Sequence, residues 1–162
     1  MKDKSQFKKT FNIILKALEL SKQRAIIGLG WNSLDYNESI PEAAFLVDNV
    51  PFTWLFTQMA AVVYHGGAGT TATGLYAGKP TIVIPFSADQ PAWGRRVYEL
   101  GVGAKPIPKK KLTAEKLASA IIYSLNPKVV AKAEYLGQKL RKEKGVDTAV
   151  KIINDYIKAN CN

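Results

Sequence analysis

The chain has 162 residues, a formal net charge of +10 and a hydrophobic fraction of 47%. These values are typical of a single soluble domain with its own core, and no apolar run is long enough to cross a membrane. The only cysteine, Cys161, and the single histidine exclude an internal disulfide and a zinc site of the usual kind. We therefore expect one domain over residues 1–162, no metal site and a reducing, cytoplasmic setting.

The positive charge leaves several kinds of partner open. A basic surface can meet nucleic acid, an anionic membrane or an anionic small ligand, or it can simply be solvated. The basic residues are densest after Lys105, and aromatic residues do not alternate with them at stacking spacing. We expect no nucleic-acid partner, and we expect residues 109–111 to be a solvated lysine loop.

The first third of the chain predicts one helix, two strands and a second short helix. Residues 5–21 carry apolar side chains at steps of three and four, as an amphipathic helix does. Residues 24–30 and 45–48 are short apolar runs that predict strands, and residues 31–42 between them are polar and rich in turn formers. The short helix that follows has Thr53 as its predicted N-cap.

The centre of the chain, residues 61–90, predicts a strand, a glycine-rich turn, a helix and a second buried strand. The turn has the sequence HGGAG and follows directly after the apolar residues 61–64. The helix is predicted to begin near Thr70 and to stop at Gly78, and the second strand covers residues 81–85.

The rest of the chain predicts an edge strand, residues 102–107, and more helices. Asp89, Gln90 and Pro91 open the first of these helices, and Thr113 caps the second. The predicted helices cover residues 93–100, 113–125, 128–144 and 147–159. Because strands and helices alternate throughout, we expect an α/β fold: a Rossmann-like parallel sheet with helices on both faces.

The helix after the glycine turn predicts an anion site. Its first amides have no partner within the helix and its dipole is positive at that end, so a phosphate is stabilised there. Ligands of an open parallel sheet bind beyond the carboxyl ends of its strands, where His65, Thr70, Asp89 and Gln90 are expected to lie. The glycine spacing matches neither a Walker A loop nor the G-x-G-x-x-G dinucleotide fingerprint.

Several of these residues also have a simpler interpretation. Asp89 can serve as an N-cap of the helix that follows it, alone or together with a role in binding. Trp54, Trp93 and Tyr64 are expected to be packing residues and are left outside the predicted site.

Two stretches carry a resemblance to a known family: HGGAGTT, residues 65–71, and AGKPTIVIPFSADQPAWGRRVYELGVG, residues 77–103. They resemble the donor-binding, C-terminal half of GT-B UDP-glycosyltransferases, and among these the sterol glucosyltransferase branch. The segments FLVDNVPFTWLF and KPIPKKKLTAEKLA fit the same branch. The resemblance extends from about Ala17 to the final helix and implies the C-terminal half of a GT-B fold.

The resemblance implies that matching residues bind a UDP-sugar such as UDP-glucose. His65 corresponds to the histidine that hydrogen-bonds the donor phosphate, and Asp89 and Gln90 to the pair that binds the hydroxyls of the transferred sugar. Asn49 and Val50 correspond to the segment beside the uracil. The turn that holds the pyrophosphate corresponds to Gly67, Ala68, Gly69 and Thr70.

The chain departs from the family pattern in several places. Phe52 and Thr53 stand where the family usually has His-Asp, Tyr64 stands where a second histidine is common, and Thr73 where many plant-type members have glutamate. These changes leave room for a weaker hold on the nucleobase or ribose. The family's first strand of this domain and its acceptor-binding domain, which carries the catalytic base, have no counterpart in the sequence.

The resemblance therefore implies the UDP-sugar-binding half of an inverting glycosyltransferase acting on a sterol or similar lipid alcohol. No residue is a candidate for the catalytic base, so we expect donor binding without turnover, and no cofactor besides the UDP-sugar substrate. The alternative is a non-catalytic nucleotide-sugar-binding subunit that pairs with a separate acceptor domain. A homodimer through the exposed domain face and a peripheral membrane contact also stay open.

Overall fold

The computed structural model describes residues 4–29 and 40–160. The predicted turn-rich segment, residues 31–42, and the end of the first predicted strand at Gly30 lie largely outside the described residues. The elements in chain order are α1 (Lys4–Ser21), β1 (Ala25–Gly28), β2 (Ala44–Val47), α2 (Phe52–Gln58), β3 (Val62–Tyr64), α3 (Ala68–Tyr76), β4 (Thr81–Val83), α4 (Gln90–Glu99), the 3-10 turn η1 (Lys109–Lys111), α5 (Ala114–Ser124), α6 (Pro127–Lys142) and α7 (Gly145–Asn160).

The strands form two small parallel sheets where the sequence predicts one. β1 pairs with β2, with Ala25 opposite Ala44, and β3 pairs with β4, with Val62 opposite Thr81. In the described part of the chain no strand joins β1 to β3, so the expected sheet is present as two halves. The parallel direction of the strands and the α/β class are as predicted.

The predicted edge strand, residues 102–107, is reduced to a single parallel bridge between Gly103 and Thr81. The Thr81 amide donates to the Val102 carbonyl oxygen at 3.1 Å. A β-carbon on Gly103 would lie 1.9 Å from the Thr81 carbonyl oxygen, so only glycine allows this approach. Pro106 has no N–H to donate, which prevents a regular ladder from continuing along the segment.

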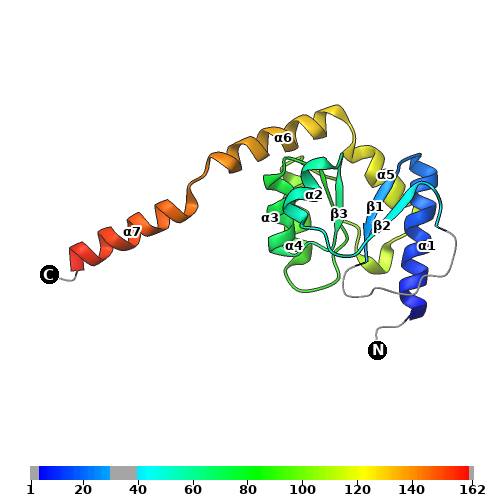
Figure 1. Ribbon diagram of the computed structural model, residues 1–162, viewed down its shortest axis with the longest axis horizontal. Helices are drawn as coiled ribbons and strands as arrows, with labels where there is room; N and C mark the ends of the chain where they lie inside the picture. Colours follow the sequence, from blue (N-terminus) through cyan, green and yellow to red (C-terminus); the bar gives the residue numbers. More distant parts are fainter. Residues whose placement is uncertain (1–3, 30–39, 161–162) are drawn as a thin grey trace.

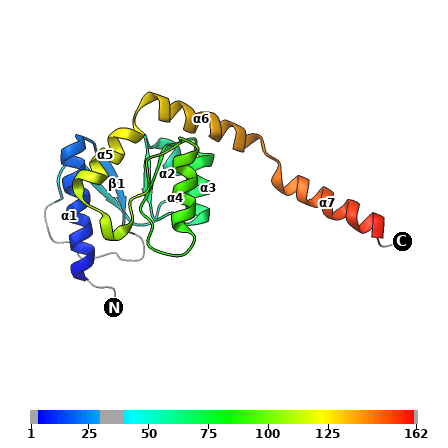
Figure 2. The same cartoon turned by 180° about the vertical axis from the view of Figure 1, so that it is seen from behind.

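β4 is the centre of the core, and alternate residues of this strand face different layers of helices. Ile82, and Ile84 just after the strand, pack with residues of α1 and α5, whereas Val83 packs with Val97 of α4 and Ala133 of α6. Figure 1 shows α1 and α5 to one side of the strands and α3 and α4 to the other, and Figure 2 shows the same layers from behind. Helices therefore cover both faces, as the alternation of elements predicts.

The start of α2 differs from the prediction. Pro51 is the N-cap of this helix and Thr53 lies inside its first turn, where it makes no capping hydrogen bond. The fixed φ of Pro51 and its missing N–H end the preceding extended chain there. Thr113 caps α5 as predicted, because its hydroxyl accepts a hydrogen bond from the Lys116 amide at 3.3 Å.

α7 extends away from the rest of the molecule in Figures 1 and 2. No residue of this helix is buried, and its large apolar side chains are 48% to 78% exposed. These side chains are Val146, Val150, Ile152, Ile153, Tyr156 and Ile157. None of the described helices has the length and apolar character needed to span a membrane.

Candidate functional site

Two loops meet where β3 and β4 end, and Gly66 is the contact between them. Gly66 has a φ of +95°, and a β-carbon on it would lie 2.5 Å from Val83 Cγ1 and 3.1 Å from the Gln90 carbonyl oxygen. Only glycine fits this conformation and this space. The contact brings together residues that we call the β3–β4 rim: His65, Gly67, Ala68, Gly69, Thr70, Asp89 and Gln90.

The first turn of α3 leaves its amides free. The helix begins at Ala68 with Gly67 as N-cap, two residues earlier than predicted, and no side chain caps this end in the part of the chain that the structure describes. The Thr71 amide donates to the Gly67 carbonyl at 2.9 Å, whereas the amides of Ala68, Gly69 and Thr70 precede the first intrahelical bond. A β-carbon on Gly69 would meet nothing within 4 Å, so the space beside this turn is open.

His65 lies across the start of this helix. Its Nε2 would be 2.6 Å from a β-carbon on Gly67, and the side chain is exposed. Thr71 and Thr73 donate their hydroxyls back to carbonyl oxygens of the turn, both at 2.9 Å. The Thr70 hydroxyl has no such partner among the described residues, so His65 and Thr70 are both available to a ligand at the helix N-terminus.

Asp89 is oriented by a residue that the sequence analysis left out of the site. Its Oδ2 accepts a hydrogen bond of 2.7 Å from Trp93 Nε1. Asp89 is the N-cap residue of α4, as predicted, but its carboxylate makes no capping hydrogen bond to the helix. The spacing of four residues on one helix is a signal that could have predicted the Trp93 contact.

Gln90 has one half of its side-chain amide occupied. Its Oε1 accepts hydrogen bonds from the backbone amides of Phe86 at 2.7 Å and Ser87 at 3.3 Å. Between these residues Ala88 has a φ of 55°, a conformation that non-glycine residues adopt only where the surroundings hold them. The Gln90 NH₂ group is therefore the part that remains for a ligand.

Lys109 has partners where the sequence predicts a solvated loop. Its Nζ donates to the Thr10 hydroxyl at 2.9 Å and lies 4.8 Å from the centre of the Phe86 ring. Burial lowers the pKa of Lys109. The prediction is wrong for this lysine because Thr10 comes from α1, far away in the sequence, and the contact connects α1 to the loop that carries Asp89.

Asn49 and Val50 follow β2 and approach from the other half of the molecule. Val50 packs against the cluster of Leu55, Phe56 and Val62, on which Tyr64 also packs. Asn49 is exposed. Val50 of the predicted nucleobase segment thus packs against β3, the strand that leads into His65. The residues predicted to bind the pyrophosphate and the sugar lie at the β3–β4 rim.

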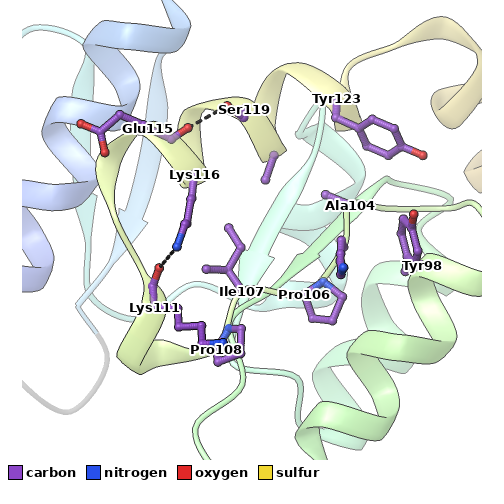
Figure 3. Close-up of a pocket in the computed structure, with 12 residues that line it drawn as sticks. Tyr98, Ala104, Pro106, Ile107, Pro108, Lys111, Glu115, Lys116, Ser119 and Tyr123 are labelled. Carbon is purple, nitrogen blue, oxygen red and sulfur yellow. Dashed lines mark hydrogen bonds between the residues drawn. The ribbon is translucent and has the colours of Figure 1, made fainter.

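The β3–β4 rim is an open surface on which His65, Ala68, Gly69 and Asp89 are exposed. The described residues include no cluster of three or more potential metal ligands. A separate hollow, the α4–α5 groove, has a volume of about 850 Å³ and appears in Figure 3. It is lined by Tyr98, Ala104, Lys105, Pro106, Ile107, Pro108, Lys111, Glu115, Lys116, Ser119, Ala120 and Tyr123.

The rim defines a class of protein. Free helix amides and an imidazole suit a phosphate, and a carboxylate beside a carboxamide suits a ligand with several hydroxyls. Their position beyond the carboxyl ends of parallel strands is where open α/β sheets bind nucleotides. The chain is thus an α/β domain suited to a phosphorylated ligand that carries hydroxyl groups.

Comparisons with known proteins place the chain within this class. Residues 13–151 match the family described as "Erythromycin biosynthesis protein CIII-like, C-terminal domain". Two sterol 3-beta-glucosyltransferases of Arabidopsis thaliana are 46% and 48% identical to the chain over 151 and 143 residues. The alignments cover 93% and 88% of this chain but only 25% and 22% of those proteins.

Glycosyltransferases of known structure have the same fold as this chain. The glycosyltransferase of kitacinnamycin superposes with a TM-score of 0.77 at 25% identity and covers 89% of this chain and 38% of its own. The calicheamicin glycosyltransferase has the same TM-score at 18% identity, with 93% and 40% covered, which shows the fold alone. The chain belongs to the C-terminal domain family of GT-B UDP-glycosyltransferases, and it spans at most about a quarter of the length of the curated relatives above.

Proposed function

We propose that this chain is the UDP-sugar-binding half of an inverting glycosyltransferase that transfers glucose to a sterol or similar lipid alcohol. The two Arabidopsis relatives are sterol 3-beta-glucosyltransferases, which supports both the sugar and the acceptor. The observation that carries the proposal is the contact of Gly66 with Gln90. It puts the N-terminus of α3 and the Asp89–Gln90 pair at one rim, within the reach of a single nucleotide sugar.

The diphosphate would lie on the first turn of α3. The amides of Ala68, Gly69 and Thr70 point out of the helix, and the helix dipole adds positive charge there. His65 and the Thr70 hydroxyl supply further hydrogen bonds, and Gly69 leaves space for the ligand. These donors can stabilise the negative charge of the diphosphate without a metal ion.

The transferred sugar would lie toward α4. Asp89 keeps its Oδ1 for a sugar hydroxyl while Trp93 holds Oδ2, and Gln90 offers its NH₂ group. Hydrogen bonds to charged groups contribute about 1.5–3 kcal/mol each, so this pair can orient the sugar. The uracil would lie beside Asn49 and Val50, which support it through main-chain contacts.

In the reaction the acceptor oxygen would attack the anomeric carbon as the bond to the diphosphate oxygen breaks. Negative charge grows on the departing diphosphate, and the α3 amides and His65 stabilise it. The proton of the acceptor hydroxyl must go to a base. In this proposal His65 is engaged by the diphosphate, and Asp89 is engaged by Trp93 and a sugar hydroxyl, so neither is free to take that proton. The base would then belong to an acceptor domain, and this chain would bind the donor without turnover.

The test is calorimetric titration of the chain and two variants with UDP and with UDP-glucose. His65→Ala should weaken both ligands by about ten- to a hundredfold, because both contain the diphosphate. Asp89→Ala should weaken UDP-glucose alone by about tenfold, because UDP has no hexose. Asp147→Ala on α7 is the matched control and should bind both ligands as the parent does.

Three outcomes would reject the proposal. One is the absence of UDP binding by the parent chain, and another is unchanged binding in both site variants. The third is an equal loss of UDP and UDP-glucose in Asp89→Ala, which would move this carboxylate away from the sugar. Loss of binding on addition of a chelator would reject the metal-free donor site.

A nucleotide-sugar-binding subunit that pairs with a separate acceptor domain is the second candidate. The apolar side chains exposed along α7 favour a covering protein surface. The relatives above are single chains about four times as long as the matching region, which favours an acceptor domain in the same polypeptide instead. Copurification of a distinct acceptor-domain chain would favour the subunit.

A further inference from the structure

The α4–α5 groove contains none of the residues of the β3–β4 rim. Its lining residue Ala104 follows Gly103, which pairs with the edge of β4 that faces away from β3. It is therefore on the opposite side of β4 from the strand that leads into His65. Its volume of about 850 Å³ is within the range of small-molecule sites.

The floor of the groove is apolar and ends at two tyrosines. Ala104, Ile107 and Ala120 form this floor and are each less than 9% exposed. Tyr98 of α4 and Tyr123 of α5 stand together at one end, as Figure 3 shows, and are 45% and 46% exposed. An alkyl chain lying along this floor would be removed from water between the two rings.

The opposite end of the groove is cationic. Figure 3 shows Lys111 and Lys116 there, and Lys116 Nζ donates to the Lys111 carbonyl oxygen at 3.2 Å. Lys105 also lines the groove. Lys111 and Lys116 thus lie at the end of the groove opposite Tyr98 and Tyr123, with the apolar floor between them, whereas Lys105 lies between the lining residues Ala104 and Pro106 in sequence.

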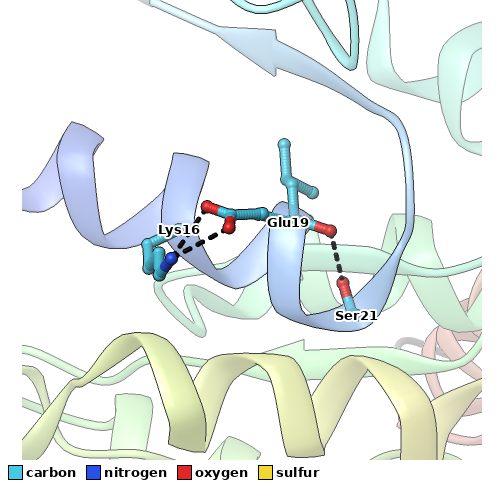
Figure 4. Close-up of polar contacts among 4 residues, drawn as sticks. Lys16, Glu19 and Ser21 are labelled. Carbon is cyan, nitrogen blue, oxygen red and sulfur yellow. Dashed lines mark hydrogen bonds and ion pairs between the residues drawn. The ribbon is translucent and has the colours of Figure 1, made fainter.

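The one acidic residue among the lining residues is turned away. In Figure 3 the Glu115 carboxylate points toward α1 and out of the groove. The backbone amide of Glu115 and the Thr113 hydroxyl, with a smaller attraction from Lys16 of α1, lower the pKa of this carboxyl. Lys16 is itself held 2.9 Å from both carboxylate oxygens of Glu19, as Figure 4 shows. The lysines of the groove therefore meet no acidic side chain inside it.

The backbone beside the groove argues against a peptide ligand. A peptide that extends a sheet must pair with free N–H and C=O groups on the edge strand. Pro106 and Pro108 lie on this edge and have no N–H. Recognition here must instead depend on apolar contact and on charge.

We propose that the α4–α5 groove binds a single-chain lipid with an anionic head. The head lies against Lys111 and Lys116, and the alkyl chain follows the floor toward Tyr98 and Tyr123. This site is separate from the β3–β4 rim and does not depend on nucleotide-sugar binding.

The test uses sodium decanoate below its micelle concentration, with decanol as the neutral ligand of equal chain length. Calorimetry should show saturable binding of one decanoate per chain and binding of decanol weaker by about tenfold, because the alcohol has no charge to meet the lysines. In methyl-resolved NMR, decanoate should shift the signals of Ile107, Ala104 and Ala120. Signals of Ala68 on the β3–β4 rim should not move.

Variants of the groove distinguish the contribution of the lysine charges to binding from that of the apolar contacts. The double change Lys111→Gln and Lys116→Gln should weaken decanoate by about tenfold and leave decanol unchanged, whereas Tyr123→Ala should weaken both. Lys151→Gln with Lys158→Gln on α7 removes the same charge elsewhere and should have no effect.

Absence of saturable decanoate binding would overturn the proposal. Equal affinity for decanoate and decanol would also overturn it, as would equal losses in the groove and α7 variants. An acidic peptide that displaces decanoate from the Ile107 methyl at lower concentration would assign the groove to a peptide instead.

Discussion

The two small sheets of this chain are packed very differently. In the β3–β4 half, Ile82 and Val83 are 0% exposed and lie between helices on both faces. In the β1–β2 half, every residue is half-buried or exposed, and Phe45 is 67% exposed. The tightly packed half carries the rim proposed to hold diphosphate and sugar, and the loosely packed half leads to the proposed nucleobase segment. The geometry of the β3–β4 rim is therefore supported by a buried core, whereas the segment after β2 follows a strand with no buried residue.

Glycine substitutions should give the largest difference in stability between the β3–β4 half and the β1–β2 half. Gly103→Ala would push a β-carbon to within 1.9 Å of the Thr81 carbonyl oxygen, whereas Gly28→Ala in β1 would meet nothing within 4 Å. We expect the first change to lower the free energy of unfolding by about 4 kcal/mol or more and the second to change it by less than about 1 kcal/mol. Urea denaturation followed by circular dichroism measures both. Equal midpoints for the two variants would show that the halves are equally tolerant.

Replacing one isoleucine in each half should give the next largest difference in stability. Ile82→Ala in β4 removes a side chain that is 0% exposed, and Ile26→Ala in β1 removes one that is 38% exposed. The cavity and the lost burial should cost about 2–5 kcal/mol for Ile82 and less than about 1 kcal/mol for Ile26. Thermal and urea unfolding of both variants provide the comparison. A larger loss for Ile26 would mean that β1 is buried in solution.

Helix caps test the same contrast on a smaller scale. Thr113→Ala removes the hydroxyl that caps α5, which packs on β4, and should cost about 1 kcal/mol. Thr53→Ala in α2, just after β2, should change stability by less than about 0.5 kcal/mol because this threonine caps nothing. Urea denaturation of both variants measures the two free energies of unfolding. A cost at Thr53 equal to that at Thr113 would restore the predicted cap.

Alkaline pH should produce the smallest effect. Burial raises the pKa of Tyr64, and the hydroxyls of Thr71 and Thr81 partly offset this. Above about pH 10 the unfolded chain releases this proton while the folded chain retains it, so the stability contribution is present below pH 10 and is lost as pH rises further. Tyr64→Phe should therefore lose less stability between pH 9 and 11 than the parent chain does. Tyr76→Phe, at an exposed position of α3, is the control, and an identical response in both variants would contradict the assignment.

The sequence predicts much of the fold because its signals are local. Alternating apolar runs and amphipathic segments gave the α/β class, and Thr113 before Lys116 marked the start of α5. The glycine turn after residues 61–64 correctly located a helix whose first amides are free, although that helix starts at Ala68 and not at Thr70. The division of the sheet was not predictable, because strand pairing depends on contacts between residues far apart in the chain.

The candidate site shows the same limit. His65, Asp89 and Gln90 were predicted from the motif and from the resemblance, but the contact of Gly66 with Gln90 depends on how two loops pack. Lys109 was predicted to be solvated. Its contacts with Thr10 and Phe86 could not be predicted, because both partners lie in other elements. Trp93 was treated as a packing residue, although its spacing from Asp89 on one helix was visible in the sequence.

The fixed side-chain amide of Gln90 determines where the rim donates and where it accepts hydrogen bonds. Its oxygen already receives hydrogens from the amides of Phe86 and Ser87, so the group cannot be turned over and only its hydrogens face outward. A ligand hydroxyl that accepts a hydrogen bond from the Gln90 NH₂ group can still donate its own hydrogen. The neighbouring Asp89 carboxylate can only accept a hydrogen bond. A ligand bound at the rim would therefore need one hydroxyl that accepts a hydrogen bond from Gln90 and one that donates to Asp89, as well as the right positions for those hydroxyls.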